Sequence, residues 1–354
     1  MSRFVRACAG LSAALFSAFA SGAPSPIVAT DVQSRIDERA HAIAAELQRL
    51  CPQAEAGDQR AFDACRQGLF DDSTLKRTLS DYVLWGRQFD PKIALKETKL
   101  TQFAPDVLTG MYVPLFMFNG KHSVEYVPSE RLYLIRLQTA FRNRLAPGQF
   151  PYPFWHDAKK WSMYENASEV LLWIDPNTER VKAAQFTGVS ANPPIVTNPS
   201  VKQAAFDGKW LWSDAAGRTQ PVVTLFDGLY RADNPFLPKL DASYKALALR
   251  LREGQCFECH VPNNPDGMKK LVLLQTPAHA AGEIRRVLKS VREDKMPRDE
   301  FGIEQPLARQ AKAVLLAEGE AFAAMVDAAR EWERGRGLTR SLEAAASLGV
   351  TPAR

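Results

Sequence analysis

The sequence contains little that marks a specialised architecture. Only 5 of its 354 residues are cysteine, so it is not a disulfide-dense scaffold. Lys and Arg outnumber Asp and Glu by 45 to 40, and a net charge of +5 is too small to indicate nucleic-acid binding. No internal repeat is present. With 24% charged and 46% hydrophobic residues, the chain has the composition of an ordinary globular protein.

Long hydrophobic runs are also missing, and the most apolar stretch lies in the first 20 residues. Arg3 and Arg6 precede an apolar, small-residue run over 11–20, and Ala18-Phe19-Ala20 fits the small-x-small rule for signal-peptidase cleavage. Because the run is shorter than the ~20 residues of a membrane-spanning helix, we expect a cleaved signal peptide over 1–20 and no membrane span in the mature protein. Cys8 precedes the run, which argues against a lipoprotein. The expected location is the periplasm.

Cleavage would leave four cysteines, in two pairs far apart along the chain. Cys51 follows a predicted helix over 31–50, and Cys65 lies inside a second predicted helix over 58–69. In an oxidising compartment we expect these two to form a disulfide that staples a helical hairpin. The alternative is two unpaired buried thiols, which secreted proteins usually avoid.

Strand signals begin near Met111 and extend to about residue 226. Asn119-Gly120 between apolar stretches predicts a hairpin, and a helix is predicted from Pro128-Ser129 through Phe141. Another hairpin is predicted at Asp175-Pro176-Asn177, and further strands at 210–212 and 222–226. Hairpin-joined strands with flanking helices indicate an α+β domain on a mainly antiparallel sheet, which we place at 21–235.

From Asp241 onward the pattern is helical alone. Helices are predicted over 241–254, from Thr276-Pro277 to about 291, and from Pro306 onward. The second domain is therefore expected to be all-α and to span 236–334, followed by a C-terminal tail over 335–354.

The motif that carries chemistry is Cys256-Phe257-Glu258-Cys259-His260, a C-x-x-C-H sequence. Residues three apart on a helical turn face the same way, so both thiols can add to the two vinyl groups along one edge of a haem. His260 then offers a neutral imidazole nitrogen to the iron. The alternatives are a redox dithiol and half of a zinc site, but zinc would need two further ligands.

On these residues, 241–334 resembles a class I monohaem cytochrome c domain. The helix ending at Gly254 resembles the family's N-terminal helix, and Met296-Pro297 resembles its methionine-proline segment. The resemblance implies one covalently bound haem c with Met296 as the sixth ligand. Met268 is too close to His260 to reach the opposite haem face, whereas His279 or an exchangeable site remains an alternative.

This resemblance implies an electron-transfer protein, since an iron with both axial positions filled exchanges electrons without binding substrate. The alternative is a haem-containing enzyme or ligand sensor whose α+β domain binds a small molecule. His156 and Asp157 are the only catalytic pair that the sequence suggests there, without a nucleophile. A dihaem peroxidase is disfavoured by the single C-x-x-C-H.

Basic residues are concentrated between the two expected haem ligands. Residues 269–298 contain eight basic and three acidic side chains. We expect Lys269, Lys270, Lys295 and Arg298 to steer an acidic redox protein to the haem edge.

Overall fold

The computed structural model describes residues 26–347 except 56–57, 72, 99, 143–163, 165, 191–192, 195–225, 227–228, 232, 257–258, 261–276 and 300. Several predictions fall outside the described residues: the signal peptide, the strand at 210–212 and most of that at 222–226, and the side chains of His156, Asp157, Met268, Lys269 and Lys270.

Two helices open the described chain, as predicted. Helix α1 spans Pro26–Leu50 and buries Ile36, Ile43 and Leu47, which lie on one face because they recur at helical spacing. Helix α2 spans Gln59–Asp71, and a short α3 spans Thr74–Thr78. The predicted Cys51–Cys65 disulfide is confirmed and joins the end of α1 to α2.

A mixed six-stranded sheet follows, in the order β2-β1-β6-β5-β4-β3. Strands β1 and β6 pair in parallel, and the other neighbouring pairs of this sheet are antiparallel. The α+β prediction is thereby confirmed for this part of the chain. The strands are β1 (Leu79–Arg87), β2 (Thr101–Phe103), β3 (Phe116–Val127), β4 (Leu132–Phe141), β5 (Glu169–Asp175) and β6 (Arg180–Thr187). Short helices lie between β1 and β3: η1 (Leu95–Glu97), α4 (Pro105–Val107), η2 (Leu108–Tyr112) and η3 (Val113–Leu115).

The hairpin predicted at Asn119-Gly120 is wrong, because this dipeptide lies inside β3. Phe118 pairs with Thr139 and His122 with Leu137, so three residues of β3 oppose one of β4. Gly120 has a φ of 79°, and this left-handed conformation forms part of a β-bulge and does not reverse the chain. The turn itself lies at 128–131, where the chain passes from β3 to β4.

The helix predicted after Pro128-Ser129 is also wrong, because residues 132–141 form β4. Tyr133, Ile135 and Leu137 of this strand belong to the main core, whereas Leu134 packs in a smaller cluster with Leu171. Apolar residues at consecutive positions are expected of a strand that is buried on both faces. The hairpin predicted between β5 and β6 is confirmed.

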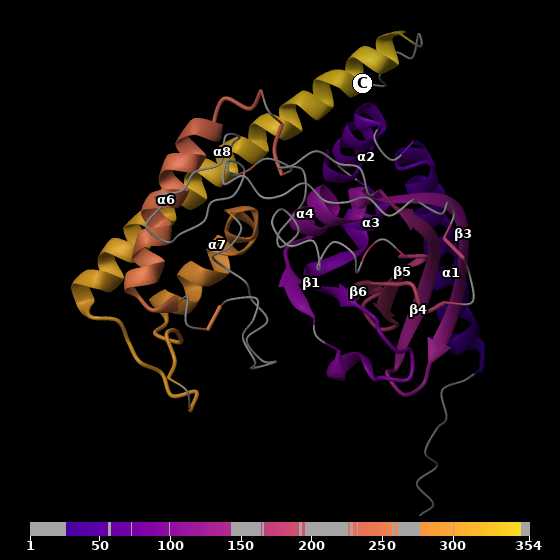
Figure 1. Cartoon of the computed structure of the whole chain (residues 1–354), viewed down its shortest axis with the longest axis horizontal. Coiled ribbons are helices and arrows are strands. Elements are labelled where there is room, and N and C mark those ends of the chain that lie inside the picture. Colours follow the sequence, from indigo (N-terminus) through magenta and orange to yellow (C-terminus); the bar gives the residue numbers. More distant parts are fainter. Residues whose placement is uncertain are drawn as a thin grey trace, which may run out of the picture.

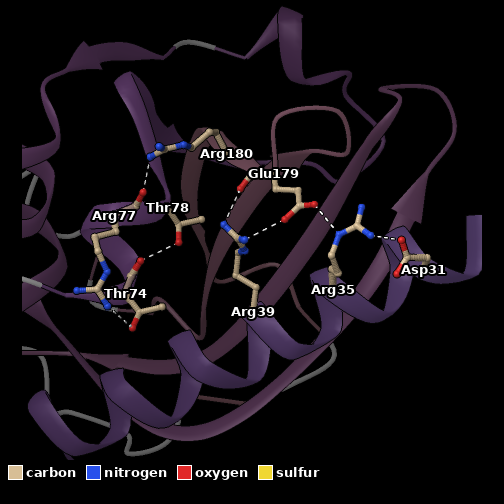
Figure 2. Close-up of polar contacts among 8 residues, drawn as sticks. All are labelled: Asp31, Arg35, Arg39, Thr74, Arg77, Thr78, Glu179 and Arg180. Carbon is tan, nitrogen blue, oxygen red and sulfur yellow. Dashed lines mark hydrogen bonds and ion pairs between the residues drawn. The ribbon is translucent and has the colours of Figure 1, made fainter. Parts of the chain in front are cut away.

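Helix α1 packs on β3 and is tied by charge to the turn between β5 and β6. Figure 2 shows Glu179 of that turn between two arginines of the helix. Arg35 Nε donates to Glu179 Oε1 at 2.7 Å, and Arg39 Nη2 donates to Glu179 Oε2 at 2.9 Å. These contacts fix the helix across the end of the sheet.

The described chain from residue 237 onward forms three helices, at the positions predicted. Helices α6 (Leu237–Glu253) and α7 (Pro277–Arg292) both pack against α8 (Arg309–Ser347), as Figure 1 shows. The segment expected as a tail is therefore helical as far as Ser347. We call residues 26–190 the α+β half and residues 226–347 the helical half.

The two halves share one hydrophobic core along a contact that we call the seam, where α7 and α8 meet β2 and α4. The ring of His279 stacks on Phe103 with centroids 4.5 Å apart. Arg330 of α8 pairs with Asp106 of α4 at 3.1 Å. A Cβ atom on Gly282 would lie only 2.6 Å from Cβ of Ala104, so the backbones approach closely here.

Candidate cofactor site

The C-x-x-C-H motif lies where α6 ends. Gly254 N donates to Arg250 O at 2.9 Å, and Gln255 adopts a left-handed φ of 60°, which turns the chain out of the helix. His260 N then donates to Cys256 O at 3.0 Å. This bond closes a helical turn that carries Cys256, Cys259 and His260 together, as their sequence spacing predicts.

Cys256 and Cys259 are not joined by a disulfide, and both are half-buried. Burial raises the pKa of the Cys256 thiol to about 11, with a smaller contribution from Cys259. Cys256 is therefore a protonated thiol at neutral pH. Since neither sulfur is in a disulfide, both are available to form a thioether link.

A cavity of about 370 Å³ borders this turn. It lies between the end of α6 and the beginning of α8, and its lining includes Gly254, Leu307 and Leu315. A Cβ atom on Gly254 would lie 3.6 Å from Cys256 Sγ, so this sulfur lies close to one of the residues that line the cavity. Its volume is in the range of pockets that hold small molecules and cofactors.

Leu307 is a lining residue that the sequence did not reveal. It lies before α8, outside any periodic pattern, and becomes part of the site only because α6 and α8 pack together. Leu315, by contrast, belongs to the apolar stripe of the helix predicted from Pro306. Helical periodicity identifies core residues of this kind but not loop residues that complete a pocket.

Met296 lies at the same end of the helical half as the motif. It follows α7, and Lys312 of α8 holds this junction through Asp294 Oδ1 at 2.6 Å and Arg292 O at 3.0 Å. Ala311 and Val314, which lie within two residues of Lys312 on α8, line the cavity together with Gly254. Helix α8 thus lies near both predicted ligand segments, the C-x-x-C-H motif after α6 and the Met296 segment after α7, at the same end of the helical half.

His279 lies at the other end of α7. Arg330 of α8 reaches Ala281 O at 3.5 Å, and it is 18 residues beyond Lys312, which is about 27 Å along a helix. The His279 ring has no hydrogen-bond partner among the described residues, and burial lowers its pKa to about 3. This geometry favours Met296 over His279 as a partner for the motif.

The basic residues after α7 are largely paired. Lys295 contacts Glu293 at 2.6 Å, Arg298 contacts Glu304 at 3.3 Å, and Arg292 contacts Glu320 at 2.5 Å. Glu304 and Glu320 lie outside the 269–298 segment, so a count along that segment misses them. The local positive excess is therefore smaller than the segment suggests.

Neither a metal-binding cluster nor a membrane helix is found in the described parts of the chain. No group of three or more His, Cys, Asp or Glu side chains there could hold a metal ion. None of the helices described is long and apolar enough to cross a bilayer. Comparison with known proteins adds no relative: no protein-family model, curated protein or solved structure matches the chain.

Proposed function

We propose that this protein is a periplasmic electron carrier with one covalently attached haem c. Cys256 and Cys259 would hold the haem, and His260 and Met296 would be its axial ligands. The observation that carries this proposal is one turn bearing C-x-x-C-H beside a cavity, at the same end of α8 as the Met296 segment.

The residues present suit such a group. Both cysteines are unbridged, and the cavity has an apolar side, formed by Leu307, Val314 and Leu315, that could contact the macrocycle. Its other side carries the polar residues Arg250, Glu253 and Gln310. When bound, the haem supplies a one-electron ferrous–ferric couple. The protein's part is to fix the imidazole of His260 on one side and to offer the thioether of Met296, which favours the ferrous form, on the other.

The direct test is the absorption spectrum of the reduced, full-length protein with and without carbon monoxide. An unchanged spectrum is expected, because both axial positions are filled by the protein. A large shift would show an open iron and would favour a haem enzyme or ligand sensor. That second candidate is supported by Arg142 of the α+β half, a buried arginine whose Nε and Nη1 have no acceptor among the described residues.

We also propose that the redox partner is an acidic protein that docks near Lys295 and Arg298. Both side chains are well exposed, at 58% and 44%, and both lie next to Met296. Lys269 and Lys270, which lie outside the described residues, belong to the same proposed set on the basis of the sequence alone. Because ion pairs neutralise part of the charge, steering should be moderate, as suits fast and weak electron-transfer contacts.

A further inference from the structure

Arg142 is a buried cation at the end of β4. The residue is 0% exposed, and its backbone N–H donates to Leu115 O at 2.8 Å, which holds it at the edge of the β3–β4 pair. Its Nε and Nη1 have no acceptor among the described residues. Nη2 reaches Pro52 O only at 3.5 Å, which is beyond the usual length of such a bond.

Other arginines of this chain are more exposed and yet are paired with carboxylates. Arg39 contacts Glu179 (Figure 2), and Arg330 contacts Asp106 at 3.1 Å. Arg136 contacts Glu125 at 2.8 Å. Their side chains are 34%, 27% and 26% exposed. Arg142 differs from them in being deeper in the protein and in having no such carboxylate partner among the residues that the structure describes.

An unpaired charge at this depth is costly. Burial lowers the pKa of Arg142 to about 10, which still leaves the guanidinium charged at neutral pH. Asp58 is the acid that acts on it, but its Oδ1 accepts from Ala61 N at 3.0 Å and caps α2. Buried donors are almost always hydrogen-bonded, and buried charges are normally paired. A bound anion would therefore stabilise the buried Arg142 guanidinium.

We propose that Arg142 anchors a binding site for a small molecule bearing a single carboxylate. A carboxylate supplies acceptor oxygens for the unpartnered N–H groups and brings one negative charge against one positive charge. Because Asp58 already acts on Arg142, a carboxylate adds less negative charge to this buried place than a phosphate dianion would. The α+β half would then bind a small carboxylic acid, independently of the haem.

The test is thermal unfolding of the full-length haem protein at pH 7 in sodium acetate and in sodium chloride of equal ionic strength. At about ten times the dissociation constant, acetate should raise the unfolding midpoint by about 3 °C. Arg142→Met should abolish this difference. Arg49→Met, which removes an exposed arginine of α1, is the matched control and should retain it.

Equal acetate effects in the wild type and Arg142→Met, or none in either, would overturn the proposal. A larger effect of phosphate would overturn the carboxylate assignment. Should Arg142→Met fail to fold, Arg142→Lys keeps the charge but loses the planar guanidinium, and calorimetric titration with acetate should show at least tenfold weaker binding; unchanged affinity would again count against the site. The haem spectrum should be the same in all variants, so this result is separate from the proposed electron-transfer function.

Discussion

The two cysteine pairs of this chain are opposites in structure. Cys51 and Cys65 are 14 residues apart, come from two helical segments, and are fully buried and bridged. Cys256 and Cys259 share one turn after α6, are half-buried and unbridged, and are followed by a histidine. The difference shows that the surroundings of a thiol pair, more than the number of cysteines, separate a bridged pair from an unbridged one.

The largest difference between the two cysteine pairs should appear when each pair is replaced by alanine in turn. Cys256→Ala/Cys259→Ala should abolish covalent haem, because both thioether links are lost, whereas Cys51→Ala/Cys65→Ala should retain it. Haem staining of a denaturing gel measures this directly. Haem that still migrates with the Cys256→Ala/Cys259→Ala protein would refute the attachment site.

The ligand opposite His260 is the next test. Met296→Ala should remove the weak near-infrared sulfur-to-iron band of the ferric protein and lower the potential by on the order of 0.1–0.3 V, within the ~0.8 V range that axial ligands set. His279→Ala, at the far end of α7, should leave both unchanged. Loss of the spectral signature in His279→Ala alone would reverse the assignment.

Loss of the buried bridge should act on stability alone. A closed loop of this length contributes about 3 kcal/mol, so Cys51→Ala/Cys65→Ala should lower the melting temperature by about 6 °C. The haem absorption spectrum of the folded protein should not change. Peptide mapping without reductant should find the two cysteines linked in the wild type, and a spectrum altered by their removal would contradict the separation of roles.

Acid should weaken the seam between the halves through His279. The folded pKa of about 3 lies below the ordinary value of 6.5, so the stabilisation is present above pH 6.5 and is lost as the pH falls toward 3. At pH 5 the loss should be about 2 kcal/mol. His279→Phe should remove this part of the pH dependence of unfolding, measured by denaturant titration at pH 7 and pH 5. Equal losses in both proteins would show that His279 is not responsible.

The smallest expected effect is on partner docking. Lys295→Glu and Arg298→Glu should slow electron transfer with an acidic redox protein by less than ~10-fold at low salt, because both residues already have acidic neighbours. Stopped-flow rates between about 10 and 300 mM salt measure the effect, and the potential should stay constant. A rate that is indifferent to both salt and charge reversal would exclude steering by these residues.

Local sequence patterns predicted much of the fold. They failed where the structure of a segment depends on its pairing with a strand that is distant in sequence. Amphipathic spacing located α1, α6 and α7, and the spacing of Cys256, Cys259 and His260 predicted their common turn. The Asn119-Gly120 dipeptide correctly indicated positive φ, but the choice between a bulge and a turn depends on pairing with β4. Residues 132–141 were misread as a helix because both faces of their strand are covered, which removes the alternation typical of a strand.

The candidate site likewise contains residues that the sequence predicted and residues that only the fold reveals. The motif and Met296 could be identified from the chain alone, whereas the cavity requires Leu307 to meet the end of α6. Whether an arginine is paired likewise depends on which carboxylates the fold brings near it. Arg142 has no acceptor for Nε and Nη1 among the described residues, whereas Arg292 is paired with Glu320 of α8. Such features come from packing between elements that are far apart in sequence.

The close approach at Gly282 has a consequence for how this sequence can change in evolution. Its missing Cβ leaves room for Ala104 of the other half, and even one methyl group at 282 would have to displace that residue. A larger side chain at position 104 or 282 would force the α+β half and the helical half apart. Substitutions at 104 and 282 should therefore be coupled in any lineage that keeps the two halves in contact, with growth at one position accompanied by loss of volume or a backbone shift at the other.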